Sequence, residues 1–302
     1  MQVIHKRQKS SAKSVQRTLK TLKDDSKLLV YGNNKLTQKQ YHLITEPKSS
    51  SMLKDFADPA KSDYWLWCHY VARNVERKET PAMIMGDACH TILLEPKLFN
   101  ERYMKKPDTI NRRTKLGREE WAELEAKCAK AGIRILDDDQ WKTATAYGAN
   151  NYDNPTAKQL LRGCQKEVSG FRILNGHLFK GRGDAINWQM KMGFDVKTVA
   201  DISPEGFAKQ AANLRYDLQE YTYKKIFGLE DFAFICYSKE EPLECVIYQL
   251  SDTWGERTER DWNAAIERIT RVSKMTKGEA QSYTGDDDPV IMLDAPYWFE
   301  RG

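Results

Sequence analysis

Two aspartates and one lysine are the residues of this sequence best suited to chemistry. Asp184 lies in Gly181-Arg182-Gly183-Asp184, and Asp195-Val196-Lys197 follows it along the chain. Residues two apart on a strand point to the same face, so Asp195 and Lys197 would share a surface. An adjacent antiparallel strand would bring Asp184 beside them. Carboxylates suit Mg²⁺, which polarises a phosphate and activates water, and an ammonium group stabilises developing negative charge. The set therefore predicts metal-dependent hydrolysis of a phosphodiester.

The Asp-x-Lys triplet has a second interpretation as an exposed ion pair. Charged residues make up 30% of the chain, and most charged side chains in proteins are solvated. Asp184 favours the catalytic interpretation, because Ala185, Ile186 and Trp188 surround it with apolar residues. A carboxylate buried there needs a partner or a metal ion.

Two predicted helices add candidate residues to this group. Gln219 and Tyr223 are four apart on one of them and therefore share a face. We expect them to support the acids, and an ordinary amphipathic face is the alternative. His90 lies on an otherwise apolar helix, where it is either a core histidine or, as a neutral imidazole, a metal ligand.

Helical patterns precede strand patterns along the chain. Asn175-Gly176 indicates a tight hairpin turn between two of the strands. The order predicts an α/β or α+β core with a helical N-terminal portion. Helices are predicted over 49–56, 63–75, 82–94, 117–131, 137–149, 156–161, from 203, over 214–227 and over 254–275, and strands over 167–174, 177–188, 190–196, 231–237 and 243–250.

Basic residues are concentrated at the N-terminus. Residues 1–50 contain eleven Lys/Arg and three Asp/Glu, whereas the net charge of the whole chain is only +5. We expect residues 1–36 to form a basic segment that is mobile or becomes ordered on a partner, in which Val15, Leu19 and Leu22 mark a short amphipathic turn. Such a segment suits a polyanion such as nucleic acid, and a solvated tail is the alternative.

The six cysteines indicate which metal centres and compartments to exclude. None of them forms a Cys-x-x-Cys pair or a tight triplet, which argues against a zinc ribbon or an iron–sulfur cluster. Their spacing is typical of reduced thiols, so we expect a cytoplasmic protein. The apolar runs are too short for a membrane span, and we expect no membrane partner.

Four elements resemble, in their order along the chain, the motif series of the PD-(D/E)XK nuclease superfamily and its RecB-like branch. They are His90, Gly181-x-x-Asp184, Asp195-x-Lys197 and Gln219-x-x-x-Tyr223. Further stretches are similar to the exonuclease VIII (RecE) nuclease family, and the similarity covers about residues 37–275. These stretches are Tyr41-His42, Ser49-Ser50-Ser51-Met52-Leu53, Met85-Gly86-Asp87-Ala88-Cys89-His90, Leu94-Glu95-Pro96, Asn111-Arg112-Arg113-Thr114 with Gly117, and Arg215-Tyr216 ahead of Gln219.

The resemblance implies a fold and a role for each candidate residue. It implies an α/β restriction-endonuclease-like core, a central mixed sheet flanked by helices with a helical N-terminal portion, and a single exonuclease domain over residues 37–302. It also implies Mg²⁺ as the cofactor, with Mn²⁺ able to substitute. The implied roles are metal ligation by His90, Asp184, Asp195 and, as a further candidate, Glu167, catalysis by Lys197 with support from Gln219 and Tyr223, and DNA binding by Arg112, Arg113, Arg182 and Arg215.

The paired arginines can also be weighed on their own chemistry. Arg112 and Arg113 form a pair able to bind a phosphate through bidentate hydrogen bonds. A solvent-exposed basic loop is the equally simple alternative, because phosphate contacts and exposed charge look alike in a sequence.

The family's activity, by resemblance, is processive 5′-to-3′ degradation of linear double-stranded DNA that leaves a 3′ single strand. The resemblance further implies a ring-shaped homo-oligomer, a RecT-type annealing protein as partner, and a phage or prophage gene expressed in the bacterial cytoplasm. One alternative is another PD-(D/E)XK nuclease, either a restriction-type endonuclease or a CRISPR-adaptation enzyme, whose iron–sulfur cluster the cysteine spacing disfavours. The other is a non-catalytic DNA-binding protein of the same fold, against which the presence of both acids and the lysine argues.

Overall fold

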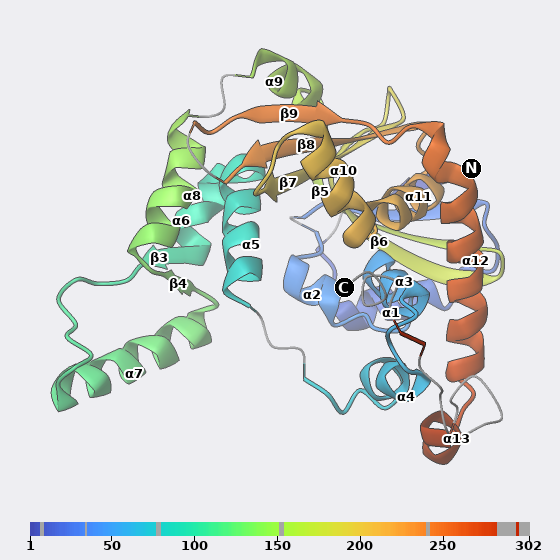
Figure 1. Ribbon diagram of the computed structural model, residues 1–302, viewed down its shortest axis with the longest axis horizontal. Coiled ribbons are helices and arrows are strands. Elements are labelled where there is room, and N and C mark those ends of the chain that lie inside the picture. Colours follow the sequence, from blue (N-terminus) through green and yellow to red (C-terminus); the bar gives the residue numbers. More distant parts are fainter. Residues whose placement is uncertain are drawn as a thin grey trace. The chain divides into compact units, whose positions relative to one another are not determined.

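The computed structural model describes residues 1–6, 9–33, 35–76, 80–150, 154–239, 242–282 and 294–295. The chain forms two compact units, Met1–Ser50 with Lys78–Thr258, and Ser51–Arg77 with Glu259–Gly302. Every candidate site residue belongs to the first unit, which contains the central sheet (Figure 1). The single domain expected over residues 37–302 stays a prediction.

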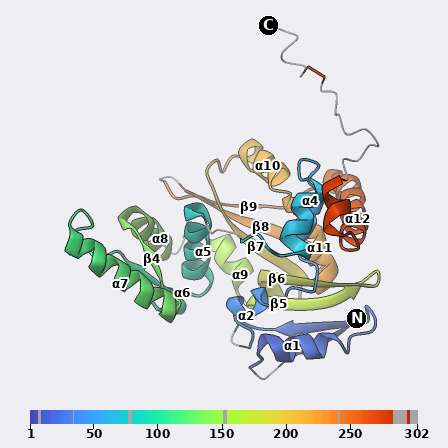
Figure 2. The same ribbon diagram turned by 90° about the horizontal axis from the view of Figure 1, so that it is seen from below.

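A seven-stranded mixed sheet organises the first unit, in the order β1-β2-β5-β6-β7-β8-β9 (Figure 2). The pairs β1–β2 and β7–β8 are parallel and the other pairs are antiparallel. The predicted mixed α/β architecture is therefore confirmed. The strands are β1 (Gln2–His5), β2 (Lys27–Tyr31), β5 (Gln165–Leu174), β6 (His177–Asn187), β7 (Met192–Val199), β8 (Asp231–Ser238) and β9 (Cys245–Tyr248).

The predicted hairpin between β5 and β6 has the expected geometry. Asn175 and Gly176 have φ values of 48° and 76°, and Leu174 pairs with His177 on either side of them. Positive φ at both central residues is what a two-residue turn compatible with strand twist requires. This turn fixes the β5–β6 register and therefore which residues of the two strands lie opposite each other.

Helices cover both faces of the sheet. On one face, α5 (Pro81–Leu94), α8 (Asp138–Asn150) and α9 (Pro155–Leu161) join a buried cluster that includes Ile235 of β8. On the other face, Tyr216 at the start of α11 (Tyr216–Phe227) stacks on Phe234 of β8, with ring centroids 5.5 Å apart. Because successive strand residues point to opposite faces, Phe234 and Ile235 place α11 opposite the α5 group.

Two glycines allow α11 to approach the sheet closely. Gly170 of β5 pairs with Gly181 of β6, and the ring of Phe227 covers both. A Cβ atom at Gly170 would lie 2.3 Å from a ring carbon of Phe227, so a larger residue would push the helix away. This approach places α11 over the strands that bear the candidate acids.

Residues 1–36 are not an unstructured extension, contrary to the sequence-based expectation. They contribute β1, α1 (Ala12–Leu19) and β2 to the first unit. Leu29 of β2 pairs with Phe171 of β5, and Val15 and Leu19 of α1 are buried in the same cluster. The physical reason is the short apolar stretch in β2, whose burial outweighs the polar composition around it.

Shorter elements complete the first unit. They are α2 (Gln38–His42), α6 (Pro96–Arg102), α7 (Lys115–Ala131), α10 (Pro204–Asn213), the 3₁₀-helix η2 (Asp252–Trp254), and the two-stranded parallel sheet of β3 (Tyr103–Lys105) and β4 (Arg134–Leu136).

The second unit is helical, and a buried ion pair stabilises it. Asp63 is 2% exposed and accepts from Arg268 Nε at 2.8 Å and from Arg271. The elements are α3 (Ser50–Ala57) and α12 (Gly255–Val272), each of which begins in the first unit, together with α4 (Asp63–Leu66), the π-helix η1 (Trp67–Val71) and α13 (Lys277–Ser282). Within the described part of the chain, no helix combines the length and the apolarity that crossing a bilayer requires.

Candidate metal and catalytic site

Three acids lie on three neighbouring strands. Glu167 of β5 and Asp184 of β6 lie between the residue pairs Lys166–Ala185 and Val168–Gly183, and Asp184 and Asp195 of β7 come directly after Ala185–Phe194, where the pairing of β6 with β7 ends. His90 reaches the group from α5, with Nδ1 3.3 Å from Asp184 Oδ2. The structure thus brings together residues that are up to 105 positions apart in the sequence (90 to 195).

Three of these side chains could hold a metal ion. His90, Glu167 and Asp184 each offer a ligand atom, and these atoms lie within 4.8 Å of one another. Carboxylate oxygens and a neutral imidazole form a donor set that suits a divalent cation. Asp195, also expected as a ligand, is not part of this group. Its Oδ1 accepts from Gln219 Nε2 at 2.6 Å, and its carboxylate forms an ion pair with Lys197.

The charge of the site favours a cation. Burial, together with the charge of Asp195, raises the pKa of Asp184 to about 8. Burial and the charge of Asp184 likewise raise the pKa of Glu167, although Arg182 opposes them. Burial, helped by the Lys197 ammonium, lowers the pKa of His90. The nearby positive charges are therefore too few to keep both carboxyl groups ionised, and a bound cation would supply the missing charge. The imidazole is neutral, which is the form that binds metal.

Lys197 is held as an ammonium group inside the site. Burial favours the neutral amine, but the charge of Asp195 outweighs it and raises the pKa of Lys197 above its ordinary value. The Nζ atom also lies 4.7 Å from the centre of the Tyr216 ring, a favourable position for a cation. A lysine that stays protonated can stabilise negative charge but cannot act as a general base.

Gln219 and Tyr223 share a face of α11, as their spacing indicates, but they make different contacts. Gln219 reaches the site and donates to Asp195. Tyr223 is 9% exposed and packs edge-to-face against Phe227 and Phe232, with ring centroids 5.9 and 6.2 Å away. Tyr223 therefore packs among aromatic rings, and its support of the site stays a prediction.

Arg182 holds Glu167 rather than facing solvent, although the sequence-based expectation is a contact with DNA. Its side chain is 9% exposed and donates to Glu167 Oε2 at 2.8 Å and to Ser169 Oγ at 2.7 Å. It also donates to Asn33, which in turn donates to Glu95. A guanidinium with this many protein acceptors has few donors left for a phosphate.

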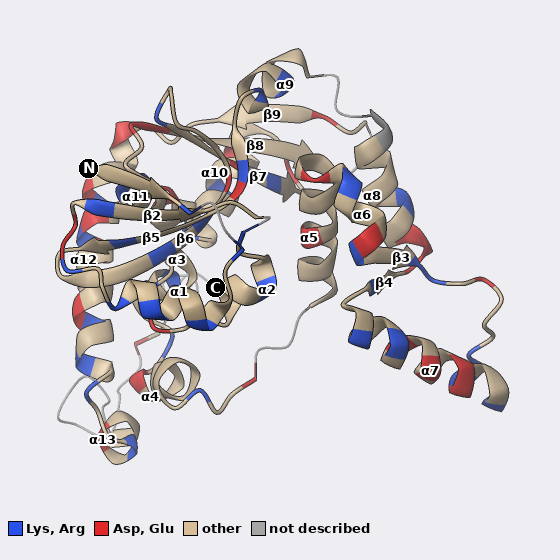
Figure 3. Cartoon of the chain, turned by 180° about the vertical axis from the view of Figure 1, so that it is seen from behind, with Lys and Arg blue, Asp and Glu red and all other residues tan. Residues whose placement is uncertain are grey.

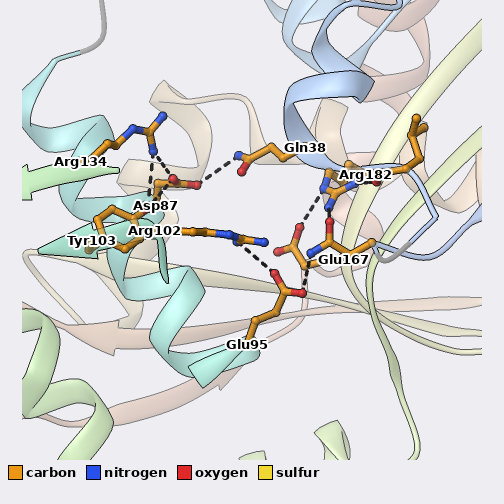
Figure 4. A network of polar contacts seen from close by, with 10 residues as sticks. Gln38, Asp87, Glu95, Arg102, Tyr103, Arg134, Glu167 and Arg182 are labelled. Carbon is orange, nitrogen blue, oxygen red and sulfur yellow. Dashed lines mark hydrogen bonds and ion pairs between the residues drawn. The ribbon is translucent and has the colours of Figure 1, made fainter. Parts of the chain in front are cut away.

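The contacts of Arg182 belong to a longer polar network around α5 (Figure 4). Glu95, at the end of α5, is also bound by Arg102, with an N–O distance of 3.1 Å. Earlier on the same helix, Asp87 accepts from Gln38 at 3.1 Å and from Tyr103 and Arg134. These contacts fix the helix that carries His90 relative to the strand that carries Glu167.

The remaining arginines expected to bind DNA lie elsewhere in the first unit. Arg215 precedes α11 with a φ of 52° and binds Asp217 through two nitrogens. Arg112 and Arg113 are exposed in the loop before α7, and the Arg112 guanidinium lies 4.6 Å from the ring centre of Trp121. Charges of both signs follow along α7 (Figure 3). A DNA contact of Arg112 and Arg113 stays a prediction.

Glu220, beside Gln219 on α11, provides a test of the electrostatics of this helix. Burial raises its pKa to about 7, with Lys224 opposing, and within the described residues its buried Oε2 has no hydrogen-bond partner. A pKa raised on folding means that stability falls as pH rises from about 4 to about 7. We expect Glu220→Gln to raise the free energy of unfolding at pH 8 by about 2–3 kcal/mol and to have little effect at pH 4.

Urea denaturation at the two pH values measures this prediction. Asp139→Asn, at an exposed position of α8, serves as the control for the loss of one negative charge. An equal effect of Glu220→Gln at pH 4 and pH 8 would contradict the assignment.

Comparisons with known proteins give a family match and a match of fold. A family model described as "PDDEXK-like domain of unknown function (DUF3799)" matches residues 49–285. The crystal structure of a "Putative exonuclease" from Eubacterium rectale is similar over 88% of this chain and 97% of its own, with 15% identity and a TM-score of 0.56. A phage-related exonuclease from Haemophilus somnus matches over 62% of this chain and 95% of its own, with 14% identity and a TM-score of 0.29. No curated protein matches the sequence.

Proposed function

Because the chain belongs to the PDDEXK-like domain family DUF3799, we propose that it is a metal-dependent nuclease. The observation that carries this proposal is the placement of Glu167, Asp184 and Asp195 on three adjacent strands, with His90 and Lys197 against them. The family match agrees with the superfamily that the motif series resembles. The narrower resemblance to exonuclease VIII supports the more specific proposal of an exonuclease, given below.

The residues of the site divide the chemistry among themselves. His90, Glu167 and Asp184 would hold a divalent cation, which when bound supplies Lewis acidity and a water of lowered pKa. Lys197 contributes a fixed positive charge that stabilises the negative charge developing on the phosphate. Asp195 orients that ammonium, and Gln219 in turn orients Asp195 through the 2.6 Å hydrogen bond.

Arg182 has a corresponding role at the other acid. It keeps the Glu167 carboxylate in place and partly balances its charge. Partners of this kind, which orient metal ligands, commonly affect metal affinity by about 10–100-fold.

The substrate and partners that we propose are more specific than the fold. We infer an exonuclease acting on linear double-stranded DNA in the 5′-to-3′ direction, with Mg²⁺ or Mn²⁺. We also propose a ring-shaped homo-oligomer and a RecT-type annealing protein as partner, within a phage-type recombination system in the bacterial cytoplasm. The supporting observations are the motif series from His90 to Tyr223 and the fold shared with the Eubacterium rectale protein.

Digestion of end-labelled DNA tests this function. With Mg²⁺, the protein is expected to shorten linear duplex DNA, to leave covalently closed circles intact, and to stop when EDTA is added. Labels at the 5′ and 3′ ends report the direction of digestion. Cleavage of closed circles at the rate of linear DNA would exclude an exonuclease and leave a nuclease, whereas cleavage in excess EDTA would contradict the metal mechanism.

A further inference from the structure

A cleft of about 870 Å³ opens beside the candidate site in the first unit. Its lining includes His90 of α5 and Lys197 of β7, and therefore two members of the site itself. The α5 wall continues through Met83 and Gly86. The size lies in the upper part of the range of about 300–1,000 Å³ that is usual for ligand pockets. A ligand in this cleft would contact the groups that we propose act on the phosphodiester.

Two lysines outside the site give this cleft its charge. Lys209 of α10 and Lys239, which follows β8, both line it, and both are exposed. Within the described part of the chain, neither ammonium group has an ion-pair partner. Lys197 also lines the cavity, but its charge is paired with that of Asp195.

The acidic residue among the described lining residues cancels only part of this charge. The Oδ1 atom of Asp201 accepts from the backbone N–H of Ser203 at 3.0 Å, next to the start of α10. This hydrogen bond, together with one from the Ser203 side chain, lowers the pKa of Asp201. A carboxylate at the beginning of a helix interacts favourably with the helix dipole. Asp201 therefore keeps its negative charge, and because Lys197 is paired with Asp195, Lys209 and Lys239 leave a surplus of one positive charge among the described lining residues.

We propose that Lys209 and Lys239 bind phosphates of the nucleic-acid strand on one side of the phosphodiester that is cleaved. This inference rests on the proposed nuclease function. It places the part of the strand next to the cleaved phosphodiester in the cleft that Lys209 and Lys239 line. Lysine ammonium groups on flexible stems act as point charges for phosphate, and a strand supplies one phosphate per nucleotide. The same chemistry would suit a free nucleotide product, so the test includes both ligands.

Binding in EDTA tests the inference without any cleavage. Fluorescence anisotropy measures the affinity of Lys209→Gln/Lys239→Gln for a labelled oligonucleotide at several salt concentrations. Each lysine that neutralises a phosphate contributes about 0.7–0.9 to the slope of log affinity against log salt concentration. We therefore expect the slope to fall by about 1.4–1.8 and the affinity at low salt to fall at least about fivefold for every oligonucleotide sequence.

Matched variants separate a local effect from a loss of net charge. Lys97→Gln/Lys142→Gln removes two exposed lysines of α6 and α8 and should keep the parental slope. Lys209→Arg/Lys239→Arg should keep it as well, since both charges remain. A lower affinity for a nucleoside monophosphate, with an unchanged slope for the oligonucleotide, would overturn the strand assignment in favour of product binding.

The failures of the two proposals are distinguishable. If the parental protein degrades DNA with Mg²⁺ but the Lys209→Gln/Lys239→Gln variant binds with the parental slope, this inference is wrong and the nuclease function stands. If the parental protein neither binds nor degrades DNA, the proposed function is wrong, and this inference with it.

Discussion

Asp184→Asn is expected to lower the rate of DNA hydrolysis by at least about 10²-fold while the protein stays folded. The charge stabilisation that a metal ion supplies amounts to several kcal/mol, and each 1.36 kcal/mol changes a rate tenfold. An asparagine carbonyl can still accept the hydrogen bond that Val196 N–H donates to Asp184 at 2.8 Å. It lacks the negative charge that the cation would need.

The same substitution should change the pH dependence of stability. The pKa of Asp184 is raised to about 8 in the folded protein, above the value of about 3.9 for an unfolded chain. The contribution of Asp184 to the free energy of unfolding is therefore greatest below about pH 4 and is lost as pH rises from about 4 through about 8. In EDTA, we expect the free energy of unfolding of Asp184→Asn to fall less between pH 4 and pH 8 than that of the parent. At pH 8 the variant should be at least as stable as the parent.

Activity and unfolding measured on the same preparations decide this prediction. Asp139→Asn, exposed on α8, is the control and should retain parental activity. Parental activity of Asp184→Asn would contradict the site assignment, and a large loss of stability at pH 8 would contradict the electrostatics derived for it.

Lys197→Gln is expected to reduce both activity and stability. Removing one donor that stabilises negative charge in a transition state costs about 10²–10³-fold in rate, and we expect a loss of at least this order here. The substitution also leaves the Asp195 carboxylate, with a side chain 3% exposed, without its ion-pair partner. Breaking a buried pair in this way costs about 3–5 kcal/mol of stability.

A double variant separates the two effects of Lys197. Asp195→Asn/Lys197→Gln removes both charges and should recover most of the lost stability, because an uncharged pair can be buried without an unpaired ion. Its activity should stay as low as that of Lys197→Gln. Equal instability of the single and double variants would show that the charge of Asp195 is not the cause. Recovery of activity in the double variant would remove Lys197 from the catalytic set.

The strands that bear the acids could be predicted from the sequence because their signals are local. Asn175-Gly176 specifies a two-residue turn, and the apolar runs on either side of it fix the neighbouring strands. Once β5, β6 and β7 follow one another in the sheet, Asp184 and Asp195 must lie on adjacent strands. The placement of His90 depended on the resemblance, because nothing local shows which element α5 contacts.

Contacts between distant segments could not be predicted in the same way. β2 is a short apolar stretch within a basic region, and it becomes a strand only because β5 offers a pairing edge. Arg182 looked available for DNA because its acceptor Asn33 lies 149 residues away. Similarly, the sequence does not show that the Asp195 carboxylate is bound by Gln219 and Lys197. Because of these contacts, the candidate metal ligands are His90, Glu167 and Asp184.

Metal-directed cleavage of the polypeptide tests the central claim most directly. Fe²⁺ with ascorbate and peroxide generates radicals at a bound metal ion and cuts the backbone nearby, and the fragments are identified by mass spectrometry. The structure predicts cuts close to His90, Glu167 and Asp184 that Mg²⁺ suppresses in the parental protein and that disappear in Asp184→Asn. Mg²⁺-sensitive cuts elsewhere in the chain, with none near these three residues, would contradict the account.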